Sequence, residues 1–86
     1  MLVTKEIVKL KRGLQARNTS IFVYKAMSFS SEVFITKNGE TSNGKEIMKV
    51  MDLNVKNGDE ITLLVNGVDE QLALHSIKNF LLSEEA

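Results

Sequence analysis

The feature that most constrains the fold is the dipeptide Asn38-Gly39, which separates two segments of strand-like composition, EVFITK and ETSN. A two-residue type I′ turn needs positive φ at both central residues, so Asn-Gly between two such segments is the strongest short-range signal for a β-hairpin. We therefore expect an antiparallel pair of strands on either side of residues 38–39.

Two further segments are predicted to be strands. Residues 3–11, VTKEIVKLK, alternate loosely between apolar and polar side chains. The apolar members of this alternation are Val3, Ile7, Val8 and Leu10. Residues 59–67, DEITLLVNG, are rich in apolar and β-branched side chains; the segment follows Asn57-Gly58 and ends with Asn66-Gly67. This composition predicts a central strand that is buried on at least one face.

Three segments have the spacing of helices. The first runs from Ala16 to Met27, with a core stripe of Thr19, Phe22, Val23 and Ala26. The second is short, roughly from Ile47 to Asn54. Asp69 is expected to N-cap the third, whose core stripe is Ala73, Leu74, Ile77, Phe80 and Leu81. The resulting order, β-α-β-β-α-β-α, predicts one α+β domain over residues 1–86, with the helices on one face of an antiparallel sheet.

Composition limits the classes of function that the chain can have. The chain has 11 lysine and arginine residues and 11 aspartate and glutamate residues, so no net field steers it to nucleic acid or to a membrane surface. It contains no cysteine, which excludes a disulfide framework and thiolate chemistry. No apolar run approaches the ~18 residues of a membrane span, and no signal-peptide pattern is present. We expect a cytoplasmic protein that binds neither nucleic acid nor a membrane.

Two stripes of side chains are not explained by core packing. On the first predicted helix, Arg17, Ser20, Ile21 and Tyr24 recur at i, i+3, i+4 and i+7, beside the core stripe. On the short helix, Val50 and Leu53 can point inward, which leaves Met48 and Met51 on a neighbouring face. Exposed tyrosine and methionine are typical of protein-binding surfaces. A small domain also exposes scattered apolar side chains without any function, so periodicity leaves both interpretations open.

Several segments together resemble HPr, the small phosphocarrier of the bacterial sugar phosphotransferase system. They are GLQAR at 13–17, KNGE at 37–40, NGKEIMKVMDL at 43–53 and NGDEITLLVNGVDEQLAL at 57–74. The resemblance spans nearly the whole chain without a gap. It implies an open-faced sandwich in which three helices lie on one face of a four-stranded antiparallel sheet.

The resemblance also implies that the phosphocarrier position has changed. In HPr proteins the loop before the first helix carries a histidine that takes phosphate from Enzyme I and passes it to sugar permeases, whereas this chain has Gln15. A carboxamide nitrogen is not a nucleophile at neutral pH, because its lone pair is delocalised. Arg17 of the family motif is kept, and Asn18 replaces the usual proline. Crh-like members of the family also have glutamine here, and this chain is more similar to them than to HPr itself.

The second changed position is the regulatory serine that some HPr proteins present at the start of the short helix. There, phosphorylation creates a form that docks onto the catabolite-control repressor. Glu46 stands in that place, and it carries one permanent negative charge where a phosphoserine would carry about −1.5 to −2. Alternatively, Glu46 is simply an acidic residue in a first helical turn, where it favours the helix dipole by ~0.3–1 kcal/mol. Crh-like proteins retain the serine, so kinase regulation is not implied for this chain.

The resemblance and the stripes together indicate a non-catalytic regulatory module. Its expected partner is a protein, namely a catabolite-control regulator, Enzyme I, a permease domain or a metabolic enzyme. The expected binding residues are Arg17, Ser20, Ile21, Tyr24, Ile47, Met48 and Met51, beside Gln15 and Glu46. One alternative is a phosphocarrier that uses another acceptor, but the sequence has no nucleophilic nitrogen near the loop. A second alternative is a decoy that occupies Enzyme I or a permease domain without turnover.

Other polar side chains give no chemical site. His75 is the only histidine, and periodicity turns it toward solvent without a second ligand at metal-binding spacing. We expect no metal and no cofactor. For Thr19, Ser20 and Ser42, we expect surface positions and hydrogen bonds to the local backbone.

Overall fold

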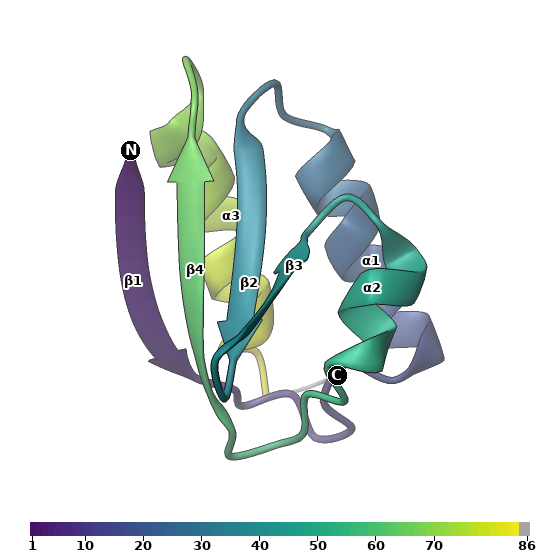
Figure 1. Ribbon diagram of the computed structural model, residues 1–86. Coiled ribbons are helices and arrows are strands. Elements are labelled where there is room, and N and C mark those ends of the chain that lie inside the picture. Colours follow the sequence, from purple (N-terminus) through teal and green to yellow (C-terminus); the bar gives the residue numbers. More distant parts are fainter. Residues whose placement is uncertain (85–86) are drawn as a thin grey trace.

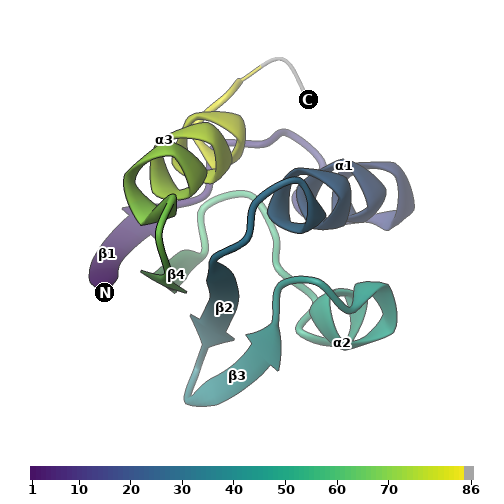
Figure 2. The same ribbon diagram turned by 90° about the horizontal axis from the view of Figure 1, so that it is seen from above.

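Residues 1–84, which a computed structural model of the chain describes, contain four strands and three helices in the order expected from the sequence. The elements are β1 (Leu2–Ile7), α1 (Ala16–Met27), β2 (Glu32–Lys37), β3 (Glu40–Asn43), α2 (Ile47–Asp52), β4 (Glu60–Asn66) and α3 (Glu70–Leu81). The last two residues of the expected domain, 85 and 86, lie outside the described part. The strands form one antiparallel sheet in the order β1-β4-β2-β3, and the three helices lie on one face of it (Figures 1 and 2).

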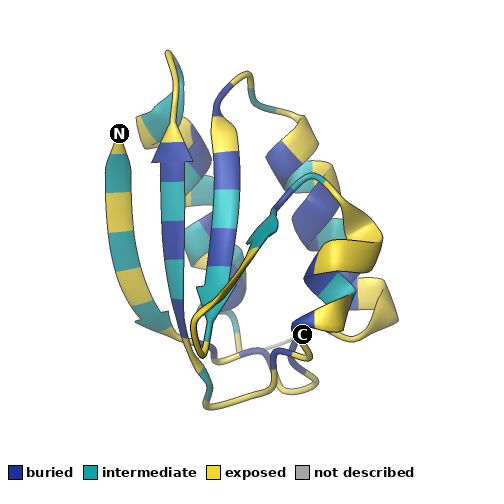
Figure 3. Cartoon of the chain, in the orientation of Figure 1, coloured by how far each residue is buried: buried dark blue, intermediate teal, exposed yellow. Residues whose placement is uncertain are grey.

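The predicted central strand, β4, has neighbours on both sides and alternates in burial along its length (Figure 3). Ile61, Leu63 and Val65 are buried toward the helices, while Leu64 between them is half-buried on the open face. The register places Leu63 beside Ile35 of β2, which is also fully buried. The alternation follows from the two-residue period of a strand that has one face covered.

The helices supply the other half of the core through the stripes predicted for them. On α1, Phe22, Val23 and Ala26 are buried, as is Thr19. On α3, Ala73, Ile77 and Leu81 are buried, and Leu74 and Phe80 pack against the core while partly exposed. The short helix contributes Val50, with Leu53 just after its end. Each helix therefore packs on the sheet with the apolar face that its helical period predicts.

The predicted hairpin is confirmed. Asn38 and Gly39 have φ of +51° and +82°, and they connect β2 to β3 with Lys37 opposite Glu40. These are the positive φ values that a two-residue turn of this type requires.

The predicted boundaries of two elements are wrong. The first strand ends at Ile7 and does not reach residue 11. Val8 and Leu10 are core residues of the connection that follows, where the backbone N–H of Lys9 donates to Leu81 of α3 (2.9 Å) and not to a strand. The short helix ends at Asp52, because Asn54 has a φ of +53°, and a left-handed residue cannot continue an α-helix.

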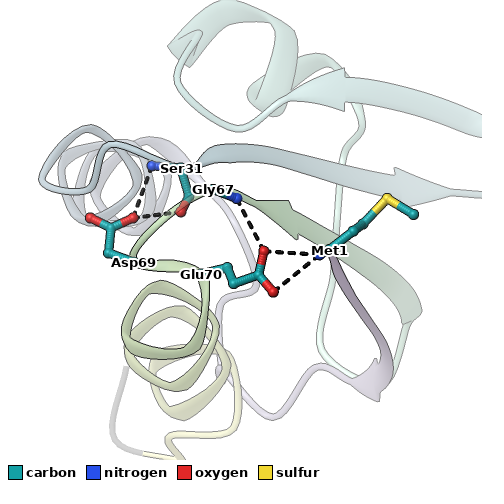
Figure 4. Close-up of polar contacts among 5 residues, drawn as sticks. All are labelled: Met1, Ser31, Gly67, Asp69 and Glu70. Atoms are coloured by element: carbon teal, nitrogen blue, oxygen red, sulfur yellow. Dashed lines mark hydrogen bonds and ion pairs between the residues drawn. The ribbon is translucent and has the colours of Figure 1, made fainter.

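Asp69 was expected to cap the last helix with its side chain, and this expectation is wrong. Asp69 occupies the N-cap position of α3, but its side chain makes no capping hydrogen bond. The carboxylate instead accepts hydrogen bonds from the backbone N–H groups of Ser30 (2.9 Å) and Ser31 (3.0 Å) and from the Ser31 hydroxyl (Figure 4). The Ser31 hydroxyl and the Ser30 N–H hold the pKa of Asp69 below its usual value of 3.8. Asp69 therefore ties the β4–α3 connection to the α1–β2 connection.

Glu70, the first residue of α3, closes the same connection on its other side. Its carboxylate lies 2.9 Å from the ammonium nitrogen of Met1 and accepts a hydrogen bond from the backbone N–H of Gly67 (3.1 Å; Figure 4). Both contacts lower the pKa of Glu70, the Met1 ammonium more strongly. Within residues 1–84, no helix has the length and apolar character needed to cross a membrane.

Candidate functional site

The loop before α1 is held against the core by its backbone and by one buried side chain. Leu14 is buried, and its N–H donates to the carbonyl of Val55 (2.9 Å). Gly13 has a φ of +58°, and a Cβ at this position would collide with the same carbonyl oxygen. Only glycine combines this conformation with so close an approach. The loop is therefore fixed in place immediately before residue 15.

Two side chains from the first turn of α1 reach back to fasten the loop. Asn18 is buried, and its Nδ2 donates to the carbonyl of Gly13 (2.8 Å). The buried Thr19 hydroxyl donates to the carbonyl of Leu14 (2.7 Å). The core position and the local backbone hydrogen bond predicted for Thr19 are confirmed, and the predicted surface position is wrong. For Asn18 the sequence predicts no role beyond the replacement of the family's proline. Asparagine often hydrogen-bonds to the nearby backbone. The presence of Asn18 shortly after Gly13 was therefore the sequence signal that could have predicted this contact.

Gln15 occupies the N-cap position of α1 with an exposed side chain that makes no capping hydrogen bond. It contributes to a shallow cavity of about 600 Å³. The residues that line this cavity are Lys11, Arg12, Gln15, Ala16, Arg17, Asn18 and Ile21. Three of them are cationic and none is acidic, and α1 has no acidic residue in its first turn. The cavity therefore carries a positive potential that favours acidic groups.

The expected binding residues of α1 lie along its outer surface. Arg17, Ser20 and Tyr24 are exposed, with Tyr24 at 76%, and Ile21 is half-buried. The Ser20 hydroxyl donates to the carbonyl of Ala16 (3.1 Å), one turn earlier. Arg17 and Ile21 also line the cavity beside Gln15, so the stripe and the loop form one continuous region.

The expected binding residues of α2 lie on a helix that packs beside α1 (Figure 2). Met48 is 66% exposed, Ile47 is exposed and Met51 is half-buried, while Val50 and Leu53 point inward as expected. We call the exposed parts of both helices the α1–α2 surface. Its members are Gln15, Arg17, Ser20, Ile21, Tyr24, Glu46, Ile47, Met48 and Met51.

The expected place of Glu46 in a first helical turn is wrong, although the helix begins at Ile47 as predicted. Glu46 is the N-cap residue of α2 and not a member of the first helical turn, with extended backbone (φ −114°, ψ 107°) and no side-chain capping bond. The side chain is exposed, and no ion pair engages it in the described part of the chain. Its charge is therefore free to meet another molecule.

The remaining polar candidates occupy ordinary structural positions. His75 is exposed on α3, with its Nε2 3.1 Å from Nδ2 of Asn79. The Ser42 hydroxyl donates to the carbonyl of Lys49 (3.0 Å), which joins β3 to α2. Among residues 1–84, no cluster of three or more His, Cys, Asp or Glu side chains is arranged to hold a metal ion.

Comparisons with known proteins agree with this architecture. Residues 3–83 match the family described as "PTS HPr component phosphorylation site". The HPr-like protein Crh of Halalkalibacterium halodurans is 45% identical over 84 residues, which cover 96% of this chain and all of that protein. The crystal structure of HPr from Bacillus anthracis superposes with a TM-score of 0.91 at 38% identity, covering 93% of this chain and 95% of the other.

A second solved structure is that of Bacillus subtilis Crh, which forms a dimer with a swapped domain. It is 44% identical to this chain, covers 98% of it and 97% of its own length, and has a TM-score of 0.77. Sequence and fold therefore agree over nearly the full length, and the chain belongs to the HPr family.

Proposed function

We propose that the protein is a non-catalytic regulatory module that docks onto a protein partner through the α1–α2 surface. The observation that carries the proposal is Gln15 at the N-cap of α1. It lies on the loop that carries the phosphocarrier histidine in HPr relatives. The lining of its cavity offers amide, guanidinium and ammonium groups, none of which is a nucleophile at neutral pH. A firmly held, cation-lined site without a nucleophile is suited to binding and not to phosphoryl transfer.

The exposed side chains of α2 support the docking role. Met48 and Tyr24 present large flexible and aromatic groups to solvent on neighbouring helices. Methionine adapts its shape to a partner, and tyrosine anchors interfaces at low entropic cost. Glu46 adds a permanent negative charge at the edge of the same surface, where a phosphorylated serine would place its own in regulated relatives.

The relatives suggest which process the partner serves. Bacillus subtilis Crh is a catabolite repression protein, and the present chain is 44% identical to it. We therefore propose a cytoplasmic partner from carbon catabolite regulation, with the catabolite-control regulator as the first candidate. Because Glu46 cannot be phosphorylated, docking would be constitutive.

The test compares two variants of the α1–α2 surface by titration against the homologous catabolite-control regulator, with a melting curve for each. Met48→Ala removes exposed apolar area and keeps the charge, and should weaken binding by more than about 1 kcal/mol if Met48 is an interface anchor. Glu46→Gln keeps the size of the side chain and removes the charge, and should weaken binding by at least ~1 kcal/mol, the scale of a charge-assisted hydrogen bond.

Leu72→Ala is the matched control, because Leu72 is also largely exposed but lies on α3. It should leave the affinity unchanged. If Glu46 only favours the helix dipole, Glu46→Gln should instead lower the free energy of unfolding by ~0.3–1 kcal/mol with unchanged affinity. Unchanged affinity for both Met48→Ala and Glu46→Gln would exclude the surface. Binding to Enzyme I in place of the regulator would favour the decoy.

A further inference from the structure

The chain contains four methionines and no cysteine. Thioethers are therefore its only sulfur groups, and a peroxide meets no thiol on this chain that would react first. A thioether reacts through a sulfur lone pair that carries no proton, so a methionine needs only contact with the oxidant. The fold controls this contact, because it decides which sulfur atoms solvent can reach.

The four thioethers differ in exposure. Met1, Met27 and Met48 are largely exposed, whereas Met51 is half-buried. A peroxide in solution therefore reaches three of the sulfur atoms directly. The fourth is partly shielded by the rest of the fold.

The three exposed methionines lie in different parts of the molecule. Met1 precedes β1, the edge strand at the far side of the sheet from β3 and α2 (Figure 1). Its ammonium contacts Glu70, and its thioether points away from that contact (Figure 4). Met27 is the last residue of α1, at the opposite end of the helix from Gln15. Of the four methionines, all of which lie within the described residues, only Met48 is both largely exposed and a member of the α1–α2 surface.

Met48 is also the main apolar group that α2 presents to solvent. The helix has six residues, and its Val50 is buried in the core. Ile47 and Met48 are the large apolar side chains that it exposes, and Met48 is the more exposed of the two. A chemical change at the Met48 sulfur therefore alters much of the apolar area that α2 offers to a partner.

We propose that Met48 is a site of reversible oxidation that switches off docking through the α1–α2 surface. This inference rests on the function proposed above. The Met48 sulfur attacks one oxygen of hydrogen peroxide, an S–O bond forms, and the O–O bond breaks. The sulfur is oxidised by two electrons, and the departing oxygen takes them and leaves as water with the proton of the transferred oxygen. The product is methionine sulfoxide, and no metal or cofactor takes part.

The sulfoxide changes what Met48 can offer a partner. Its S–O bond is polar and its oxygen accepts hydrogen bonds, so burying it in an apolar pocket without a donor is costly. The flexible apolar group that adapts to a partner is lost at the same time. Glu46 gives the surface a charge that phosphorylation cannot switch, whereas methionine sulfoxide reductases return the sulfoxide to the thioether. Oxidation of Met48 therefore supplies the surface with a reversible control.

The first measurement follows oxidation without a partner. The folded chain and the chain unfolded in urea receive the same concentration of hydrogen peroxide labelled with heavy oxygen, and peptide mass spectrometry follows each methionine. Met48 should be oxidised in the folded chain at close to its unfolded rate, and Met51 should be oxidised more slowly than when unfolded. Equal protection of Met48 and Met51 by the fold would overturn the proposal.

The second measurement follows docking. Met27→Leu removes the exposed thioether at the end of α1, and Met27→Leu/Met48→Leu is its matched control. Each chain is treated with peroxide, freed of peroxide and titrated against the homologous catabolite-control regulator. Oxidation should weaken binding of Met27→Leu by about fivefold or more, the loss expected for an interface anchor. The double variant should keep whatever affinity it had before treatment, because its remaining exposed thioether, Met1, lies far from α2.

Repair completes the test, and the outcomes separate this inference from the proposed function. Methionine sulfoxide reductases that act on the two sulfoxide epimers should restore the affinity of oxidised Met27→Leu. The switch fails alone if the reduced chain binds the regulator but oxidised Met27→Leu keeps its affinity, or if the double variant loses affinity to the same extent. If the reduced wild-type chain does not bind the regulator, the proposed function fails and the switch fails with it.

Discussion

Gln15 and Thr19 lie four residues apart in the sequence and act on the same loop in different ways. Gln15 presents an exposed carboxamide to the cation-lined cavity. The buried Thr19 hydroxyl donates a hydrogen bond to the carbonyl of Leu14, the residue immediately before Gln15. One side chain sets what the loop can do chemically, and the other sets where the loop lies.

Replacing Gln15 with histidine tests the proposed loss of phosphocarrier chemistry. The wild-type chain should keep its mass after incubation with Enzyme I and phosphoenolpyruvate, whereas Gln15→His should gain one acid-labile phosphoryl group. The imidazole restores a neutral nitrogen nucleophile, and the N-terminus of α1 stabilises the transferred anion. Intact mass before and after mild acid gives the result. Gln71→His, on the exposed side of α3, is the control and should gain nothing. Acid-labile phosphate on the wild-type chain would contradict the proposal.

Removing the Thr19 hydroxyl tests how the loop is held. Thr19→Val keeps the shape of the side chain but leaves the carbonyl of Leu14 without this donor. The free energy of unfolding should fall by about 1–3 kcal/mol, the cost of leaving a buried polar group without its partner. Ser20→Ala is the control, because its hydroxyl makes an exposed bond within α1, and it should change stability by less than about 0.5 kcal/mol. Equal losses in urea titrations of the two variants would show that the Thr19 bond has no special role.

Among the elements, the connection between β4 and α3 is held in place by the carboxylate of Asp69. Asp69 accepts hydrogen bonds from the Ser31 hydroxyl and from the backbone N–H groups of Ser30 and Ser31. These bonds favour the ionised carboxylate and lower its pKa in the folded chain. A group whose pKa is lower when folded stabilises the fold above its unfolded pKa. That contribution is lost as the pH falls through the folded pKa.

Asp69→Asn should therefore lower the melting temperature at neutral pH. The Asn side chain retains one acceptor oxygen but loses the charge and cannot accept at its Nδ2. The difference from the wild type should be constant above the unfolded value of about 3.8 and should shrink below it, as the wild-type carboxylate becomes protonated. Melting curves across acid pH give this comparison. Glu32→Gln, an exposed carboxylate of β2, is the control and should leave the acid limb unchanged. A pH-independent gap for Asp69→Asn would contradict the linkage.

The whole molecule is an open-faced sandwich, so the two faces of its sheet contribute very differently to stability. Leu63 and Leu64 are adjacent on β4, yet Leu63 is fully buried beneath the helices and Leu64 is half-buried on the open face. Because a strand turns successive side chains to opposite faces, the two leucines share a strand and differ in what covers them.

Truncating each leucine measures this difference. Leu63→Ala should lower the free energy of unfolding by about 2–5 kcal/mol, the usual cost of a core cavity. This is a large part of the ~5–15 kcal/mol that holds a domain of this kind together. Leu64→Ala should cost clearly less, because water already reaches part of the side chain. Denaturant titration with a common m-value would check both. Similar losses would mean that something covers the open face in solution, such as a second copy of the chain.

Local sequence determined those elements that depend only on residues close to one another in the chain. Asn38-Gly39 specifies its hairpin because both residues tolerate positive φ, and the apolar spacing within Ala16–Met27 gives α1 its bounds and its buried face. The β-branched run of β4 predicted its central place. The candidate surface residues could be named from the same spacing, because a stripe beside a core stripe must lie near solvent.

Tertiary structure decided the features that depend on distant partners. Asp69 binds Ser30 and Ser31, 39 and 38 residues away, instead of capping its own helix. The carbonyl of Leu81 in α3 accepts a hydrogen bond from the N–H of Lys9, where the alternating pattern predicted that the first strand would continue. Side-chain type fixes what each group can donate or accept. Because the fold determines which partner comes within hydrogen-bonding distance, and these partners lie far apart in the sequence, local patterns carry no information about such contacts.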